Sequence, residues 1–381
     1  MLGLFSCGRY RFVLRADSPL RLNAFAGSTL RGGFGHIFKS TICIWPPGDC
    51  PRCLLKNTCA YPYIFETAPP PGSEKLRNLD QIPRPFVIEP PEFEPALNLT
   101  PHSAHSSPRA AVSCGATSII ARHVGAAQSI NDPTTRLSHG VTYKPNDCFE
   151  FGLVLIGRAI DSLPYFLFTF IELGRVGLGP SRGRCTVLQV DADRPDGCEC
   201  IYTHDSGVLA DHQSRIAAAD IVASAEKFAP SNLTRGASPF QHLDSAALTV
   251  RFLTPTRIRS SGDFRMEITF QDLIRALLRR LSSLCYFHCG GELKVDFKGL
   301  IEQAAAVRTV NSNLRWQRQD RVSGRQHRRI EMGGVIGSVT FAASNEQGFV
   351  PFLPLLTAGE WVHVGKGCVM GLGKFRVEVP A

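Results

Sequence analysis

The chain has 381 residues, a size that suits two domains better than one core, and 44% of its residues are hydrophobic. Its net charge of +9 and its pI near 9.0 favour a polyanionic partner such as nucleic acid. No apolar run approaches the roughly 18 residues that a membrane-spanning helix needs, and the first residues lack the layout of a signal peptide. We therefore expect a cytoplasmic protein.

Strand and helix patterns alternate along the first half of the chain. Residues 61–110 are rich in Pro, Ser and charge, which is typical of a loop or insertion and not of a core. Residues 191–245 are weakly patterned, and we expect a linker with peripheral structure there. The predicted elements of this half are a strand at 4–16, a helix at 25–45, a buried strand at 148–160, a helix at 163–176 and a strand that follows the loop beginning at 177.

The second half repeats the order strand, helix, strand, strand, helix, strand, which is the ferredoxin-like order. Its predicted elements are a strand at 247–255, a helix at 264–287, strands at 301–316 and 333–343, a helix at 349–361 and a strand at 373–379. The predicted fold class is therefore α+β, with two tandem ferredoxin-like (RRM-like) domains. We place them at 1–195, with Cys-rich and Pro-rich insertions at about 43–146, and at 246–381, with the linker at 196–245.

A glycine-rich, basic loop precedes the last predicted strand, in the stretch HVGKGCVMGLGKFRV at 363–377. Its spacing matches neither a P-loop nor a dinucleotide fingerprint, because the glycines lead into a strand and not into a helix. Glycine-rich backbone can approach an anion closely and hold it with N–H groups. A tight turn that merely needs positive φ is the alternative. The residues of this candidate phosphate site are Gly365, Lys366, Gly367, Gly371, Gly373 and Lys374.

Two further segments carry the same kind of signal. A loop at the corresponding place in the first half contains Gly177, Gly179, Arg182 and Arg184, which suggests a duplicated unit. The segment RWQRQDRVSGRQHRR at 315–329 is strongly basic, and arginine binds phosphate through paired hydrogen bonds. Its Trp316 could stack on a base or lie in the core. The candidate RNA-binding arginines of this segment are Arg315, Arg318, Arg321, Arg325 and Arg328.

The thirteen cysteines are odd in number and mostly scattered, which argues against a disulfide framework. Four of them form a cluster with Pro and Gly turns between them: Cys43, Cys50, Cys53 and Cys59. Four thiolates suit a closed tetrahedral site for structural Zn²⁺, which would have no catalytic role. Unmetallated thiols and an iron–sulfur cluster are the alternatives.

His36 lies near the start of the first predicted helix, just after three glycines. A histidine there could act as a general base or acid, with Arg31 and Lys39 as charged neighbours. A surface or capping histidine is the alternative, and His363 and His327 are weaker candidates.

Seven segments occur in an order that resembles a known family: FAGSTLRGGFGH, the cysteine cluster with YPYIFE, IPRPFVIEPP, GRVGLGPSRGR, TVRFLTPTRIR, MGGVIGSVTF and HVGKGCVMGLGKF. Together they resemble the CRISPR-associated endoribonuclease of the RAMP superfamily that processes precursor CRISPR RNA. The resemblance spans residues 24 to 376. Only three residues separate Gly367 from Gly371, a shorter gap than is usual in the glycine-rich signature of the family.

The resemblance implies two tandem ferredoxin-like domains, binding of CRISPR repeat RNA and a metal-independent cut that leaves a 2′,3′-cyclic phosphate and a 5′-OH. A histidine near the first helix commonly serves as base or acid in this family, so the role passes to His36, with Lys39 or Arg31 as charge stabiliser. Two alternatives remain. One is a non-catalytic RAMP-fold subunit that holds crRNA beside other CRISPR effector subunits, and the other is a zinc-stabilised protein that binds RNA in general.

Overall fold

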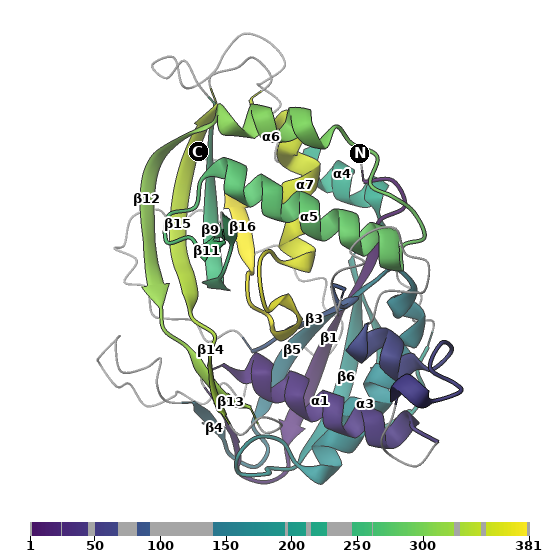
Figure 1. The fold of residues 1–381 in the computed structure, drawn as a ribbon. Helices are drawn as coiled ribbons and strands as arrows, with labels where there is room; N and C mark the ends of the chain where they lie inside the picture. Colours follow the sequence, from purple (N-terminus) through teal and green to yellow (C-terminus); the bar gives the residue numbers. More distant parts are fainter. Residues whose placement is uncertain are drawn as a thin grey trace.

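The computed structural model shows two α+β halves that lie against each other, with the glycine-rich loop between them (Figure 1). Each half contains a ferredoxin-like sheet, so the predicted fold class is confirmed. No described helix is both long enough and apolar enough to span a membrane. The structure describes residues 2–23, 25–44, 50–67, 82–91, 140–194, 197–210, 215–226, 246–260, 262–323, 328–343 and 348–378.

The first half follows the ferredoxin-like order. Its sheet is antiparallel, with strand order β3-β5-β1-β6-β7, and β8 (Ile216–Ala217) pairs with β1. β2 (Leu20–Leu22) pairs with β4 (Val141–Tyr143) beside it, and α4 (Ala218–Glu226) follows β8. The main elements are β1 (Ser6–Ala16), α1 (Ala26–Ile42), β3 (Phe86–Glu89), β5 (Cys148–Ile156), α3 (Leu163–Val176), β6 (Cys185–Arg194) and β7 (Gly197–Thr203).

Side chains along β1 point alternately to the two faces of this sheet, and the apolar ones mark the face that the helices cover. Tyr10, Phe12 and Leu14 point to one face and join a core with residues of α1 and α3. Aromatic rings fill much of this layer, and the ring centroids of Phe34 and Phe166 lie 4.6 Å apart. The intervening residues of β1, including Arg9, point to the other face, which therefore remains available to the second half.

The second half has strand order β12-β15-β9-β16, again ferredoxin-like. α5 begins at a capping box formed by Thr269 and Asp272. Two short hairpins extend from the sheet: β10 (Arg259–Ser260) with β11 (Asp263–Phe264), and β13 (Asp320–Ser323) with β14 (Arg328–Glu331). The main elements are β9 (Ala246–Thr256), α5 (Phe270–His288), α6 (Phe297–Ala305), β12 (Arg308–Gln317), β15 (Gly334–Ala343), α7 (Leu353–Val362), the 3₁₀ turn η5 (Cys368–Met370) and β16 (Phe375–Glu378).

Two element predictions were wrong in part. The Pro-rich stretch 61–110 contains β3, whose four residues are all buried in the sheet. The strand predicted from residue 301 begins as helix α6, because the side chain of Asp296 caps the N–H of Gly299. Within residues 191–245, where a linker with peripheral structure was expected, β7 and β8 extend the first sheet.

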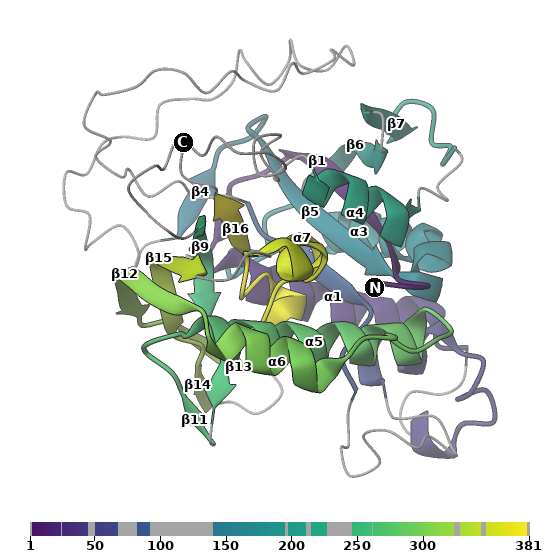
Figure 2. The same ribbon diagram turned by 90° about the horizontal axis from the view of Figure 1, so that it is seen from above.

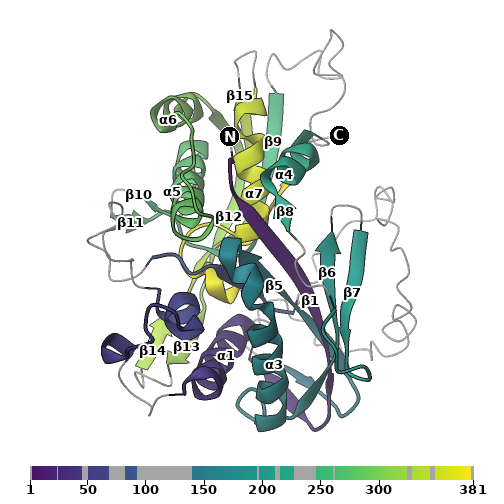
Figure 3. The ribbon, with the colours of Figure 1, turned by 90° about the vertical axis from the view of Figure 1, so that its right-hand side faces the viewer.

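Besides the core of the first half, a second apolar core contains residues of both halves. The helices of the second half pack on its own sheet, and Val87, Val154 and Ile156 from the first sheet join the same cluster. Viewed from above, α7 lies beside the second sheet (Figure 2), and η5 of the loop that follows α7 contacts both α1 and β3. The views in Figures 1 and 3 both place the β13–β14 hairpin beside α1. Strand β3, helix α1, the glycine-rich loop and the β13–β14 hairpin therefore meet at the boundary between the halves.

Candidate nucleic-acid interface

A buried carboxylate lies at this boundary. Glu89, the last residue of β3, is 4% exposed. Arg9 of β1 donates from Nε to Glu89 Oε2 at 2.9 Å, and its Nη2 lies 2.8 Å from the same oxygen. The guanidinium of Arg9 also lies 5.6 Å from the ring centroid of Trp361 on α7. Because both Glu89 and Arg9 belong to the first half, this pair presents a negative group to the second.

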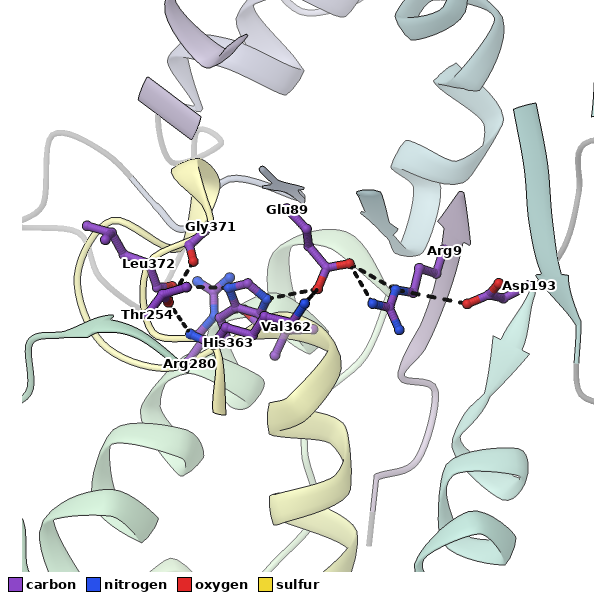
Figure 4. A network of polar contacts seen from close by, with 10 residues as sticks. Arg9, Glu89, Asp193, Thr254, Arg280, Val362, His363, Gly371 and Leu372 are labelled. Atoms are coloured by element: carbon purple, nitrogen blue, oxygen red, sulfur yellow. Dashed lines mark hydrogen bonds and ion pairs between the residues drawn. The ribbon is translucent and has the colours of Figure 1, made fainter. Parts of the chain in front are cut away.

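The second half supplies two partners to Glu89 (Figure 4). His363, directly after α7, places Nε2 3.3 Å from Glu89 Oε1 and Nδ1 3.1 Å from the carbonyl oxygen of Leu372. Lys374 places Nζ 3.4 Å from Glu89 Oε1. These two residues flank the glycine-rich loop, so the carboxylate holds both of its ends.

The pKa values of Glu89 and His363 are shifted by burial and by the neighbouring charges. Burial alone would raise the pKa of Glu89, but the hydrogen bond from His363 and the charges of Arg9 and Lys374 hold that pKa far below its ordinary range. Burial lowers the pKa of His363. Both partners of the His363 ring are acceptors, so a neutral ring donates to one of them at a time. His363 is fully buried, and substrate cannot reach it as the weaker catalytic candidate would require.

The backbone of the glycine-rich loop is committed to internal contacts. Gly371 and Gly373 have positive φ, and a Cβ on either would lie within 2.3 Å of Pro90 or of the Val364 carbonyl. Of the six candidate phosphate-site residues, four donate their amides within the protein: Lys366 to Arg257 O, Gly371 to Cys368 O, Gly373 to Pro255 O and Lys374 to Thr254 Oγ1. These amides are not free to hold an anion as the sequence suggested. Among the lysines of the loop, Lys366 is exposed and Lys374 is half-buried.

A small apolar cluster joins the loop to α1 and to the β13–β14 hairpin. It contains Phe25, which precedes α1, Met370 and Leu372 from the loop, and Met332, which follows β14. A Cβ on Gly27 of α1 would lie 1.9 Å from the Met370 carbonyl, so the helix and the loop approach backbone to backbone. The basic hairpin, the loop and the start of α1 are thereby fixed to one another.

The predicted catalytic residues all lie on α1. His36 is exposed there. The guanidinium of Arg31 lies 4.2 Å from the ring centroid of Phe65, and Nζ of Lys39 lies 5.3 Å from that of Tyr61. Both cations therefore rest on aromatic rings of the segment that follows the cysteine cluster. The catalytic roles of these three residues stay a prediction.

The predicted RNA-binding arginines are spread over the two halves. Arg182 and Arg184 are exposed in the first glycine loop, whose Gly177 and Gly179 pack against the Arg182 and Arg21 carbonyls. In the basic segment, Arg315 and Arg318 are exposed. Trp316 is half-buried against the core of the second half. Arg321 lies in β13 and Arg328 in β14, whereas Arg325 and His327 lie outside the described residues.

The four clustered cysteines are half-buried and reduced, between α1 and the π-helical turn η2 (Pro62–Glu66), with the 3₁₀ turn η1 (Cys50–Arg52) between them. Burial raises the pKa of the Cys50 thiol, as do the neighbouring Glu66, Cys43 and Cys59. Among the described residues, no group of three or more His, Cys, Asp or Glu side chains is placed to hold one metal ion. Residues 45–49 of this segment lie outside the described part of the chain, and the zinc site stays a prediction.

The sequence reasoning missed Arg9 and Glu89. The signal for Glu89 was the short apolar run FVIE between Pro85 and Pro90, which is typical of a buried strand bounded by breakers. Arg9 carried no separate signal beyond the alternation of β1.

Two family models match separate parts of the chain. The AF_1859_N family, described as an N-terminal domain, matches residues 5–106 and 126–214, which is half of the chain. The family described as CRISPR-associated endoribonuclease Cas6 matches residues 250–375. A comparison with curated proteins finds no significant relative.

Solved structures resemble the chain at low sequence identity. A partial Cas6-RT-Cas1–Cas2 complex gives a TM-score of 0.51 at 11% identity, covering 99% of this chain and 46% of that one. The chain thus spans about half the length of that relative. A Cas6 product complex (TM-score 0.49, 13% identity) and Cas6 of Thermus thermophilus (0.46, 11%) each cover 98% of this chain and 99% of theirs. Only the first score is high enough to support the fold.

Two ferredoxin-like units with a glycine-rich loop between them give the chain the fold of that Cas6-containing complex. The chain belongs to the AF_1859_N family, whose model covers half of it, and residues 250–375 match the family described as CRISPR-associated endoribonuclease Cas6.

Proposed function

We propose that the protein cleaves CRISPR repeat RNA in the cytoplasm to produce guide crRNAs, without a catalytic metal. The observation that carries this proposal is the position of His36, exposed on the helix whose start packs against both the glycine-rich loop and the β13–β14 hairpin. An RNA strand held by those basic segments would pass close to α1. The match of residues 250–375 to the family described as CRISPR-associated endoribonuclease Cas6 supports the substrate class.

The proposed reaction needs one proton removed and one supplied. The ribose 2′-oxygen attacks the adjacent phosphorus, a new O–P bond forms, and the bond from phosphorus to the 5′-oxygen breaks. A base takes the 2′-OH proton and an acid protonates the leaving 5′-oxygen. His36 supplies the base or the acid, and Lys39 or Arg31 stabilises the charge that develops on the phosphate. The products carry a 2′,3′-cyclic phosphate and a 5′-OH.

Cleavage of the protein's own repeat RNA in EDTA tests this proposal. We expect one specific cut, lost by about 100-fold or more in His36→Ala, the scale of general acid–base catalysis. The 3′ end of the upstream product should resist ligation until acid opens the cyclic phosphate and a phosphatase then removes the remaining monoester. His204→Ala, an exposed histidine on the first half, is the matched control and should retain full activity. A cut that requires added metal would overturn the mechanism.

A second candidate is a non-catalytic RAMP-fold subunit that holds crRNA within an effector complex. A solved relative that combines Cas6 with Cas1 and Cas2 favours assembly with other CRISPR proteins. Specific binding of repeat RNA without any product would support this role. Equal affinity for unrelated RNAs would instead support a general RNA-binding protein.

The proposal includes a structural Zn²⁺ at Cys43, Cys50, Cys53 and Cys59. Its support is the chemistry of four reduced thiols in one segment and the electrostatic contact of Cys50 with Cys43 and Cys59. Metal analysis of freshly purified, reduced protein should give about one zinc per chain, and Cys53→Ser should lose it. Cys198→Ser, an exposed cysteine elsewhere, is the control. A wild type without zinc would refute this part.

A further inference from the structure

Three cationic residues meet beside the glycine-rich loop. Arg257 lies between β9 and β10, Arg259 begins β10, and Lys366 lies in the loop itself. The guanidinium groups of Arg257 and Arg259 lie 4.1 and 4.8 Å from the centroid of the same ring, Phe264 of β11. The Lys366 amide donates to the Arg257 carbonyl at 3.1 Å. The backbone therefore holds the three side chains as neighbours.

The loop backbone adds rigidity to this arrangement. Gly365 has φ +87°, and a Cβ there would lie 2.4 Å from the Arg257 carbonyl. Arg257 Nη1 donates to the carbonyl of Glu331 at the end of β14, at 2.9 Å. The cation cluster is thus anchored to the loop on one side and to the basic hairpin on the other.

Positive charge is in excess at this place. Among the described residues, neither Arg259 nor Lys366 forms an ion pair with a carboxylate, and Glu331 is the acid that acts on Arg257. Arg257 Nε is buried with no hydrogen-bond partner among the described atoms. Burial lowers the pKa of Lys366, and the charges of Arg257 and Arg259 lower it further. Like charges held this close repel one another unless an anion binds between them.

We propose that Arg257, Arg259 and Lys366 form a binding site for a backbone phosphate of the RNA, with side chains and not loop amides supplying the contacts. This inference rests on the proposed function and deepens it. Arginine offers paired N–H donors to phosphate oxygens, and lysine adds a point charge. Four of the six candidate residues of the loop, Lys366, Gly371, Gly373 and Lys374, already donate their amides within the protein, whereas the side chains of Arg259 and Lys366 are exposed. The glycines then serve to bring Lys366 against Arg257.

Binding to repeat RNA with 2′-O-methyl riboses tests the site, since this RNA cannot be cleaved by 2′-OH attack. Lys366→Met and Arg259→Met should each raise the Kd about 5- to 10-fold. Each should also reduce the slope of log K against log salt by about 0.7, the value for one lost contact to a single strand. Lys298→Met is the matched control, because Lys298 is exposed on α6 and paired with Glu302 at 3.8 Å; its Kd should match wild type. Both substituted residues are exposed, and equal Tm values would show intact folding.

The outcomes separate this site from the proposed function. A phosphate contact carries no sequence information, so the same loss is expected with an unrelated RNA of equal length. If wild type fails to cut unmodified repeat RNA but the two variants still lose affinity, the function is wrong and the site stands. If wild type cuts and both variants bind within twofold of it with an unchanged salt slope, the site is wrong.

Discussion

The two glycine-rich loops have similar sequences and different surroundings. The loop at 177–184 packs on β2 of its own half and leaves Arg182 and Arg184 exposed. The loop at 363–374 is wedged between the halves, and its Lys374 is paired with the buried Glu89. A G-x-G pair followed by a basic residue thus forms a surface turn in one half and a contact between the halves in the other. The difference comes from β3, which places a carboxylate opposite the second loop only.

Removing the Glu89 carboxylate is expected to have the largest effect on the difference between the two loops. Glu89→Gln leaves Arg9 and Lys374 beside a neutral group, and we expect a loss of about 3–5 kcal/mol in the free energy of unfolding. Urea denaturation measures this loss. Glu172→Gln, which removes an exposed pair with Arg175 on α3, is the control and should cost under about 0.5 kcal/mol. Similar small losses in both variants would show that the joint is unimportant for stability.

The packing of the second loop gives the next effect. Gly371→Ala combines a left-handed backbone with a Cβ 2.3 Å from Pro90, and we expect about 3 kcal/mol of destabilisation. Gly290→Ala has a similar positive φ and no atom within 4 Å of its Cβ, so it isolates the backbone strain at about 1–2 kcal/mol. Urea denaturation measures the loss of stability in both variants. An equal cost in the two variants would contradict close packing between loop and β3.

Acid should lower the stability of the protein through a histidine at the boundary between the two halves. His288, at the end of α5, places Nε2 2.7 Å from the Pro83 carbonyl of the first half. Burial lowers the pKa of His288 to about 4, helped by the charges of Arg158 and Arg280. The unfolded chain binds a proton below about pH 6.5 and the folded one resists it, so stability should fall from about pH 6.5 to about pH 4 and then level off for this group. The loss is roughly 3 kcal/mol.

Thermal unfolding across this pH range checks the acid effect. His288→Gln should flatten this part of the profile, whereas His204→Gln, which changes an exposed histidine, should leave it as in wild type. A profile that stays steep in His288→Gln assigns the acid sensitivity to other groups.

The smallest effect on stability is expected in the first glycine-rich loop, at 177–184. Arg182→Met should change the free energy of unfolding by less than about 0.5 kcal/mol, because Arg182 is exposed. If the first loop also binds RNA, the salt slope of RNA binding should fall by about 0.7. An unchanged slope would assign RNA contacts to the second loop alone.

Sequence patterns predicted the fold where apolar periodicity was long. The helix that became α5 and the strands β1, β9 and β15 carry enough alternating or helical spacing to be found without a structure. Short elements were missed for a physical reason. β3 has four residues between prolines, and its surroundings in the sequence are polar, so local composition concealed a strand that only tertiary pairing with β5 makes stable.

The candidate site divides in the same way. The glycine-rich loop, the arginine segment and His36 were visible as motifs, whereas the ion cluster around Glu89 was not. His363 and Glu89 are 274 residues apart, and nothing in either local sequence indicates the other. Glycine spacing also suggested free amides, but whether an amide is free depends on acceptors such as Pro255 and Arg257, more than 100 residues away from the loop.

The separation of 274 residues between Glu89 and His363 has a consequence during synthesis of the protein. At about 5–20 residues per second, a ribosome needs on the order of 14–55 s to reach His363 after Glu89 has been added. Throughout that interval the first sheet exposes Val87, Val154 and the Glu89 carboxylate, which then has Arg9 but neither of its partners from the second half, on the face that will later be covered. The ionised carboxylate keeps this transiently open surface hydrated and discourages association with other nascent chains, until Lys374 and His363 arrive to cover it.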